Sequence, residues 1–164
     1  MRLKVNGLDF IASYEGLDWQ VQEDLDACVA DKAGVHPGQV MEFFKKHPPK
    51  VQVIWVDPAS LIGPKGRAVD PPKVKEYVET WKKTPKVFPP VIIDSDRPEH
   101  AICEGGHRTV AAKRAKVSWI RAIDVAPLVR ELRESLATLR EETEEYSARQ
   151  TDEPWWLARY QGRT

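Results

Sequence analysis

Five consecutive residues combine the features of a phosphate-binding turn: Glu104, Gly105, Gly106, His107 and Arg108. Two adjacent glycines let the backbone turn tightly and approach a ligand closely, because neither carries a Cβ atom. The following residues, 109–115, favour a helix, so the amides at its start would point outward with partial positive charge. A helix start of this kind binds phosphate. The sequence therefore predicts a phosphate site at this turn.

Three side chains of the turn could add chemistry to such a site. Arg108 would bring a planar, permanently charged fork to the anion. His107 could donate to a phosphate oxygen or shuttle a proton, and Glu104 could act as a base or hold a magnesium ion. A structural role is also open for both His107 and Glu104, because a histidine at a helix start often hydrogen-bonds the backbone. The catalytic candidates are Glu104 and His107, and the phosphate-binding candidates are Arg67, Gly105, Gly106, His107, Arg108 and Thr109.

The turn lies between segments with the composition of strands. Residues 91–93 are β-branched and short, and residues 101–103 can pair beside them. After the turn come a helix over 107–115 and another strand over 119–125. The predicted order is strand, phosphate turn, helix, strand.

Upstream segments would bring a second cation to the turn. A β-branched and aromatic strand over 51–56 ends at Asp57-Pro58, and a loop rich in glycine and proline then carries Arg67. After this loop Asp70 can cap a helix that Pro71 opens, and its apolar residues recur at three- and four-residue intervals. From this loop Arg67 could reach a ligand at the turn.

Both ends of the chain are predicted to be largely helical. After an initial loop, one helix follows Asp18 and ends at Gly34, and a second runs from Pro37 to Lys46. A long charged helix over 127–149 carries one apolar stripe. That stripe consists of Leu128, Leu132, Leu136 and Leu139, and the tail beyond it contains Trp155 and Trp156.

These elements predict three parts within the 164 residues. They are an N-terminal helical extension over 1–50, an α+β domain over 51–126, and a C-terminal helix with a tryptophan-containing tail over 127–164. A chain of this length suffices for one compact domain with extensions but is short for two full domains. The N-terminal helices or the C-terminal helix could supply a surface for a protein partner or for self-association.

The composition bears on several classes of partner. Lys plus Arg and Asp plus Glu both number 25, so the chain lacks the global basic charge that drives nonspecific nucleic-acid binding. Local basic clusters, at 82–86 and 113–121, leave nucleic acid open as a partner. No apolar stretch could cross a bilayer and no signal core is present, so a cytoplasmic protein without membrane contact is expected. Cys28 and Cys103 lack metal-ligand spacing and are predicted to be reduced core thiols.

The stretch from Val53 to Val125 resembles the ParB/sulfiredoxin superfamily in the order of its pieces. In that pattern an early strand ends near a proline, a loop carries an arginine, and a helix and two short strands follow. An Asp/Glu-Gly-x-His-Arg turn then opens an alanine-rich helix. The matching pieces are Val56-Asp57-Pro58, Arg67, the helix from Asp70, Val91-Ile92-Ile93, and Glu104-Gly105-Gly106-His107-Arg108 with Ala111-Ala112. The resemblance implies a small mixed sheet with packed helices, and a bound nucleoside triphosphate or diphosphate, with or without magnesium.

Two departures narrow what the resemblance implies. Sulfiredoxins carry their reactive cysteine at the position of Gly106, and Cys103 precedes the turn where a strand would bury it and suppress its thiolate. Partition ParB proteins continue into a helix-turn-helix domain, for which the long helix after residue 126 leaves no room. The Glu-Gly-Gly-His-Arg form is closer to other members, which include free-serine kinases and proteins proposed as phosphotransferases or nucleases, some of them encoded by phages.

The resemblance therefore implies nucleotide binding at the turn, with phosphoryl transfer by a kinase or hydrolysis of a nucleoside triphosphate. Phosphoryl transfer depends on positioning and electrostatics more than on a reactive side chain of the protein. The lack of an obvious nucleophile in the sequence therefore does not exclude a kinase or a nucleotide hydrolase. A non-catalytic module that responds to a nucleotide or associates with DNA is the alternative. A nuclease is a third possibility, which the balanced charge does not favour.

Overall fold

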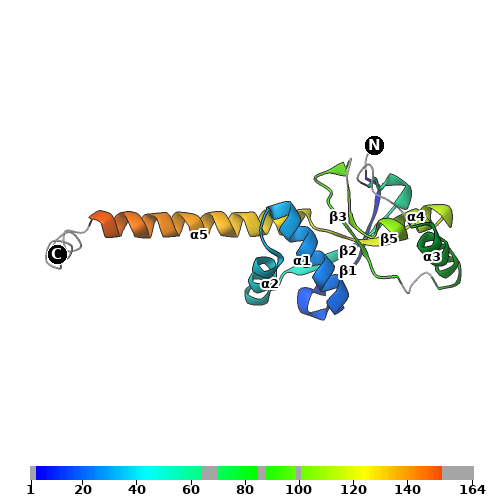
Figure 1. Cartoon of the computed structure of the whole chain (residues 1–164), viewed down its shortest axis with the longest axis horizontal. Coiled ribbons are helices and arrows are strands. Elements are labelled where there is room, and N and C mark those ends of the chain that lie inside the picture. The colour runs from blue at the N-terminus through cyan, green and yellow to red at the C-terminus, as the bar shows by residue number, and fades with distance from the viewer. Residues whose placement is uncertain (1–2, 64–69, 85–87, 99–100, 153–164) are drawn as a thin grey trace. The chain divides into compact units, whose positions relative to one another are not determined.

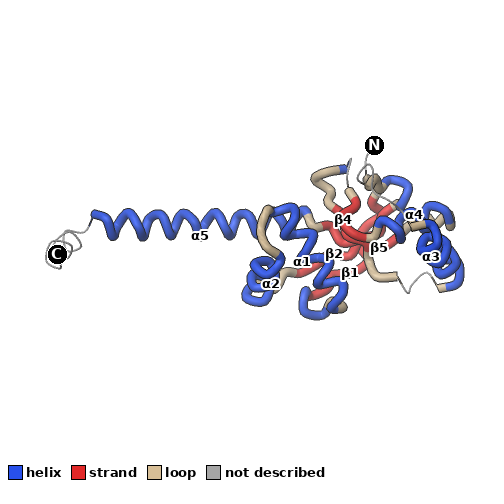
Figure 2. Tube along the Cα trace, in the orientation of Figure 1, coloured by secondary structure: helices blue, strands red, loops and turns tan. Residues whose placement is uncertain are grey.

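A computed structural model describes residues 3–63, 70–84, 88–98 and 101–152, with their side chains up to residue 142. The chain divides into two compact units, Met1–Val129 and Arg130–Thr164. The first unit is a mixed sheet packed with helices, and the second contains the continuation of the last helix (Figure 1, Figure 2). The α+β class with a small mixed sheet, predicted from the sequence, is confirmed.

In the described part of the chain, five strands form one sheet in the order β1-β2-β5-β3-β4. Their bounds are Val5–Ser13 for β1, Lys50–Val56 for β2, Val91–Ile93 for β3, Ile102–Glu104 for β4 and Ile120–Asp124 for β5. Strands β3 and β5 are parallel, whereas the β1/β2, β2/β5 and β3/β4 pairs are antiparallel. The starts of β3 and β5 therefore lie at the same end of the sheet as the end of β4, where the predicted phosphate turn begins.

The described residues contain five α-helices. They are α1 (Trp19–Ala33), α2 (Pro37–Lys46), α3 (Pro71–Lys83), α4 (Gly106–Arg114) and α5 (Ala126–Asp152). Their ends follow capping chemistry. The Asp18 carboxylate accepts the N–H of Gln20 at 2.9 Å, and Gly34 closes α1 with a φ of 72°. These bounds confirm the helices predicted from the sequence.

Side chains alternate between the two faces of the sheet, and each face carries its own helices. One core joins α3 and α4 to the face that carries Val91 and Ile93. Helix α1 contacts β3 and β4 and packs with α2 (Figure 1). Because Cys103 alternates with Ile102 of the α3/α4 core along β4, it lies on the face toward α1.

Strand β1 corrects the prediction that the residues before Asp18 form a loop at the start of a helical extension. It forms an edge of the sheet, with Val5 opposite Val56 and Ser13 opposite Lys50 of β2. Its side chains are nearly all exposed, apolar ones included, and its register shifts around Gly7, whose φ is 120°. A strand without a buried face lacks the regular alternation by which a sequence reveals a strand.

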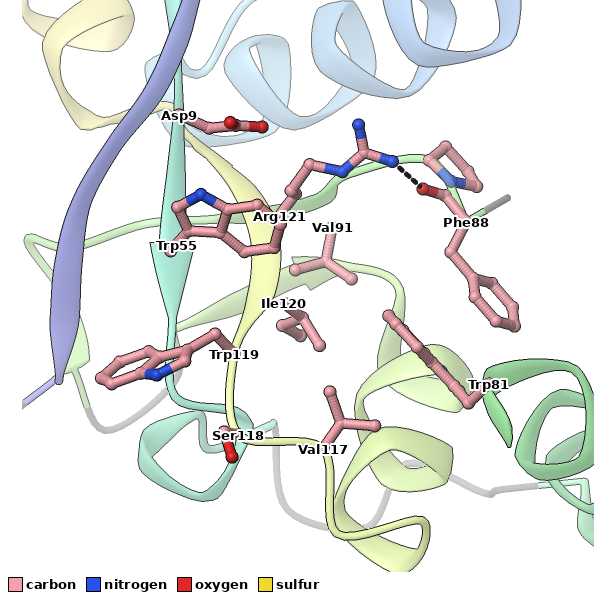
Figure 3. A pocket seen from close by; sticks show the side chains of 11 residues that line it. Asp9, Trp55, Trp81, Phe88, Val91, Val117, Ser118, Trp119, Ile120 and Arg121 are labelled. Carbon is pink, nitrogen blue, oxygen red and sulfur yellow. Dashed lines mark hydrogen bonds between the residues drawn. The ribbon is translucent and has the colours of Figure 1, made fainter. Parts of the chain in front are cut away.

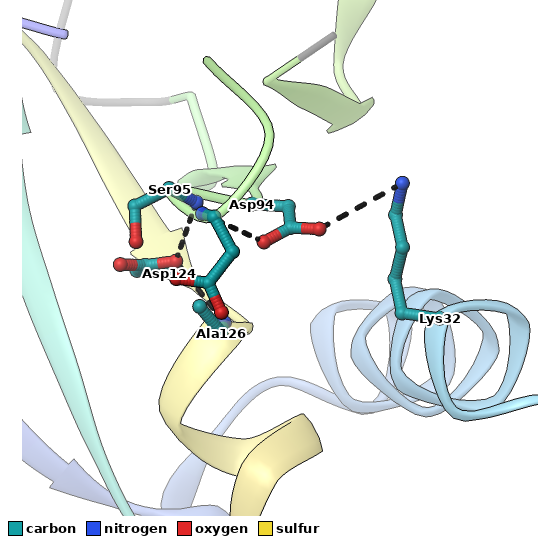
Figure 4. Close-up of polar contacts among 6 residues, drawn as sticks. Lys32, Asp94, Ser95, Asp124 and Ala126 are labelled. Atoms are coloured by element: carbon teal, nitrogen blue, oxygen red, sulfur yellow. Dashed lines mark hydrogen bonds and ion pairs between the residues drawn. The ribbon is translucent and has the colours of Figure 1, made fainter.

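Two aspartates join strands to helices at the other end of the sheet (Figure 4). The Asp124 carboxylate accepts the N–H groups of Ser95 and Ala126, both at 3.1 Å, and so ties the end of β3 to the start of α5. The buried Asp94 lies 3.8 Å from Nζ of Lys32 on α1. These carboxylates stabilise the fold away from the predicted phosphate turn.

The second unit carries part of the predicted leucine stripe. Leu136 is 38% exposed and Leu139 is 59% exposed, whereas Leu128, in the first unit, is buried. Trp155 and Trp156 lie outside the described residues. Within the described ranges, no helix has the length and apolar character to cross a membrane.

Candidate functional site

Gly105 forms the turn between β4 and α4 with a φ of +99°, a conformation that favours glycine. A Cβ atom at this position would lie 2.6 Å from Cγ1 and 2.9 Å from Cβ of Val91, the first residue of β3. It would also lie 3.0 Å from Nη2 of Arg108. Both the backbone conformation and the close approach to Val91 therefore require glycine here.

The start of α4 has no side-chain cap, because its N-cap residue is Gly105. The N–H of Thr109 donates to the carbonyl oxygen of Gly105 at 2.9 Å, so the amides of residues 106–108 precede this hydrogen bond in the helix. A Cβ atom built on Gly106 would have no neighbour within 4 Å. An anion could approach these amides without meeting a side chain at Gly106.

The Arg108 guanidinium binds the backbone that leads into β3. Its Nη1 donates to the carbonyl oxygen of Pro89 at 2.6 Å and to that of Pro90 at 3.2 Å. Burial lowers the pKa of Arg108, while the negative charge of Glu104 acts in the opposite direction. Arg108 thus braces the turn against the β3 approach, and its predicted contact with a phosphate stays a prediction.

The His107 imidazole links α4 to the start of α3. The backbone N–H of Asp70 donates to Nε2 of His107 at 3.0 Å. Asp70 is the N-cap residue of α3, but its side chain makes no capping hydrogen bond there. His107 therefore connects two helix starts that are distant in the sequence.

The remaining candidates are Thr109, Glu104 and Arg67. The buried Thr109 hydroxyl donates to the Gly105 carbonyl oxygen at 2.9 Å, which is a structural bond within the turn. Glu104 is exposed at the end of β4. Arg67 falls outside the described residues. Among the residues that the structure describes, no group of three His, Cys, Asp or Glu side chains could hold a metal ion.

The two cysteines come together beside the turn, Cys28 from α1 and Cys103 from β4. Both are free, with Cys28 buried and Cys103 partly exposed. A hydrogen bond from Cys28 lowers the pKa of Cys103, and the positive charge of Lys32 acts in the same direction against burial. The pKa of Cys28 is raised by the same hydrogen bond and by burial. The predicted burial of both thiols therefore holds for Cys28 and in part for Cys103, and their reduced state stays a prediction.

An aromatic cavity of about 580 Å³ lies at the same end of the sheet (Figure 3). Its apolar wall includes four aromatic side chains, and Asp9, Ser118 and Arg121 add polar groups. The Arg121 guanidinium donates to the Phe88 carbonyl oxygen at 3.0 Å. The four aromatic residues are Trp55, Trp81, Phe88 and Trp119.

This cavity and the turn share structural elements. Val91 lines the cavity and contacts the glycine position at 105, and Pro89 lines it and accepts from Arg108. The sequence did not reveal the cavity, because Trp55 and Trp119 belonged to predicted strands and Trp81 to an amphipathic stripe. The high tryptophan content, six in 164 residues, was the available signal. Only tertiary structure brings three of them to one place.

Comparisons of the chain with models of protein families, with curated proteins and with solved structures find no match.

Proposed function

We propose that this chain is a ParB/sulfiredoxin-like protein that binds the phosphates of a nucleotide at the start of α4. The observation that carries the proposal is the uncapped helix start behind Gly105, with open space at Gly106. Amides of residues 106–108 would donate to the phosphate oxygens, and the helix dipole would favour the negative charge. Arg67 is proposed as a further positively charged ligand of the phosphates, in addition to Arg108.

One feature favours a nucleotide-responsive module over a catalyst. Three side chains that could act on a phosphate already have structural partners: His107 with Asp70, Arg108 with Pro89 and Pro90, and Thr109 with Gly105. A phosphate at the start of α4 would lie next to the bond between His107 and Asp70. Binding could therefore be transmitted to α3.

Phosphoryl transfer or nucleotide hydrolysis is the second candidate activity. The exposed carboxylate of Glu104 is available to a magnesium ion or a proton, and the phosphates would supply the other ligands of the metal. In this case His107 would have to exchange its bond with Asp70 for one with the substrate. Loss of turnover in Glu104→Gln, with nucleotide binding retained, is the result expected of an enzyme.

A substitution at Gly106 tests phosphate binding without removing a structural contact. An aspartate in the first turn of a helix is compatible with the dipole, so Gly106→Asp should fold, but its charge would repel phosphate. Gly106→Asn is the matched neutral control. Arg108→Ala is less suitable, because it also removes two hydrogen bonds to the backbone.

Thermal unfolding with each common nucleoside triphosphate and diphosphate, with and without magnesium, provides the measurement. A ligand at a hundredfold its Kd should stabilise the native state by about 2.7 kcal/mol. We expect this stabilisation in the wild type and in Gly106→Asn, and its loss in Gly106→Asp. Absence of a shift with every nucleotide, or equal shifts in the two variants, would refute the phosphate site. Release of inorganic phosphate distinguishes turnover from binding alone.

The proposed setting is the cytoplasm, with a protein partner or a second copy of the chain as a further ligand. Exposed Trp19 of α1 and Met41 of α2 provide one candidate surface, and Leu136 and Leu139 of α5 provide another. A DNA-associated or nuclease role is a further candidate, because the basic residues of α4 and β5 are present although the net charge is zero.

A further inference from the structure

We propose that the aromatic cavity binds the base of the nucleotide, with Trp119 as the exposed ring on which a planar heterocycle stacks. This inference rests on the proposed function, because it assigns the other half of the same ligand. The turn itself has no residues that could bind a base, so the cavity would form the second part of the nucleotide site.

The walls of the cavity match a flat aromatic ligand. Its volume of about 580 Å³ lies in the range of small-molecule sites. Trp81 and Phe88 are stacked, with ring centroids 4.3 Å apart and planes inclined by 23°, and Trp119 is 36% exposed at the cavity (Figure 3). Tryptophan and phenylalanine rings stack on any of the bases, because every base presents a π-face. The cavity therefore suits a base without specifying which one.

The buried and the exposed rings of this wall would contact a base differently. Trp81 is 8% exposed, and its Nε1, which has no hydrogen-bond partner among the described residues, is buried. A base in the cavity would therefore contact the ring of Trp81 and not its N–H group. The polar groups of Asp9 and Ser118 can pair with the donors and acceptors at the rim of a base.

The position of the cavity fits a ligand that also carries phosphate. Strands β3 and β5 both begin at the cavity, at Val91 and Ile120, and the antiparallel β4 ends beside them at Glu104. The start of α4 follows directly from this end of β4. Val91 and Pro89 line the cavity; Val91 lies close to Gly105 of the turn, and the Pro89 carbonyl oxygen accepts from Arg108. A base and a phosphate on one molecule match these two neighbouring sites.

NMR of the full chain, labelled with ¹⁵N, tests the two halves separately. The probes are adenosine, guanosine, cytidine and uridine, their 5′-triphosphates, and inorganic tripolyphosphate. A nucleoside should shift the indole N–H resonance of Trp81, which Trp81→Phe assigns, because a base in the cavity would lie against this ring and change its magnetic environment. Tripolyphosphate should shift the backbone amide of Gly106 and leave the indole resonance of Trp81 in place.

Substitutions at Trp119 test the stacking. Trp119→Leu keeps an apolar side chain but no ring, and it should weaken binding of the preferred nucleoside by about tenfold or more. Trp119→Phe restores a ring and should restore most of the affinity. Trp19→Leu is the matched control, because Trp19 is 69% exposed on α1 and does not line the cavity.

The outcomes separate this inference from the proposed function. If triphosphates bind in a manner that depends on Gly106 but ignores Trp119, and no nucleoside shifts the Trp81 indole, the base site is refuted and the phosphate site stands. If nucleosides bind through Trp119 while Gly106→Asp leaves triphosphate affinity unchanged, the base site stands and the phosphate site is refuted. If no probe shifts either resonance, both are refuted.

Discussion

Two kinds of residue shape the candidate site: glycines, which lack a side chain, and two residues whose side chains bind the backbone of other segments. Gly105 leaves room for Val91 and for the guanidinium of Arg108, and Gly106 adds no side chain at the start of α4. His107 and Arg108 were predicted as ligands of a phosphate, yet both bind the backbone of other segments. The turn is therefore a structural junction as well as a candidate binding site.

The two glycines should respond differently to alanine. Gly105→Ala would combine a strained φ with a contact of 2.6 Å to Val91. We expect this substitution to lower the free energy of unfolding by about 1–3 kcal/mol or more. Gly106→Ala meets no atom within 4 Å and should leave stability nearly unchanged. Chemical denaturation of both variants measures the difference, and equal stabilities would contradict this account of the turn.

Tyr14 and Asp26 form a buried polar pair that should contribute to stability. The Tyr14 hydroxyl lies 2.6 and 2.7 Å from the two carboxylate oxygens of Asp26. Tyr14→Phe leaves this buried carboxylate without its donor and should cost about 1.5–3 kcal/mol. The double variant Tyr14→Phe/Asp26→Leu removes both partners and should recover part of the loss. A double variant less stable than Tyr14→Phe alone would count against this explanation.

The same pair predicts a pH dependence. Burial, with the hydrogen bond to Asp26, raises the pKa of Tyr14 above its ordinary value. Above about pH 10 the unfolded chain therefore releases a proton that the folded chain retains, and stability falls as pH rises. The Tyr14→Phe variant should not show this part of the loss of stability at alkaline pH. Denaturation curves at about pH 9 and about pH 11 measure how much the free energy of unfolding falls with pH in each protein. If Tyr14 is not responsible, the wild type and Tyr14→Phe should lose the same amount.

At the scale of elements, the contact between α1 and β4 changes the chemistry of a thiol. Hydrogen bonding from Cys28 and the charge of Lys32 lower the pKa of Cys103, although burial opposes them. Cys103 should therefore react with iodoacetamide faster than Cys28 near neutral pH, because more of it is thiolate. Cys28→Ala should slow this reaction and move its pH profile upward, while Cys28→Ser keeps a donor.

Mass spectrometry of the alkylated peptides over a range of pH measures both rates. Two results would contradict the proposed hydrogen bond from Cys28 to Cys103. One is faster modification of Cys28 than of Cys103, and the other is a pH profile of Cys103 that stays the same in Cys28→Ala.

Most elements could be predicted from local sequence signals. Asp18 and Gly34 mark the ends of α1 because capping chemistry is local, and the β-branched run of β2 is recognisable without its partners. Strand β1 was missed because its exposed side chains carry no regular pattern. The bonds of His107 and Arg108 were missed for another reason, since Asp70 and Pro89 are 37 and 19 residues away.

At the scale of the whole molecule, the exposed leucines of α5 predict association between copies. Leu136 and Leu139 lie about 60° apart around the helix axis, so they form one apolar stripe. We expect the chain to sediment as a larger species at higher concentration, and Leu136→Glu/Leu139→Glu to remove this dependence. The control Ala137→Glu/Thr138→Glu adds the same charge on the opposite side of the helix. Sedimentation that is independent of concentration in the wild type would exclude this association.

The sequence alone determined the helices, four of the five strands and the glycine turn, because these depend on residues close together in the chain. Tertiary structure decided which side chains meet. It directed Arg108 to proline carbonyls, placed Cys28 beside Cys103, and gathered three tryptophans around one cavity. Sheet order accounts for part of the cavity, since β5 pairs with β2 although it is the last of the described strands, and so Trp55 and Trp119 line the same cavity. Pairing between distant strands leaves no periodic signal in the sequence.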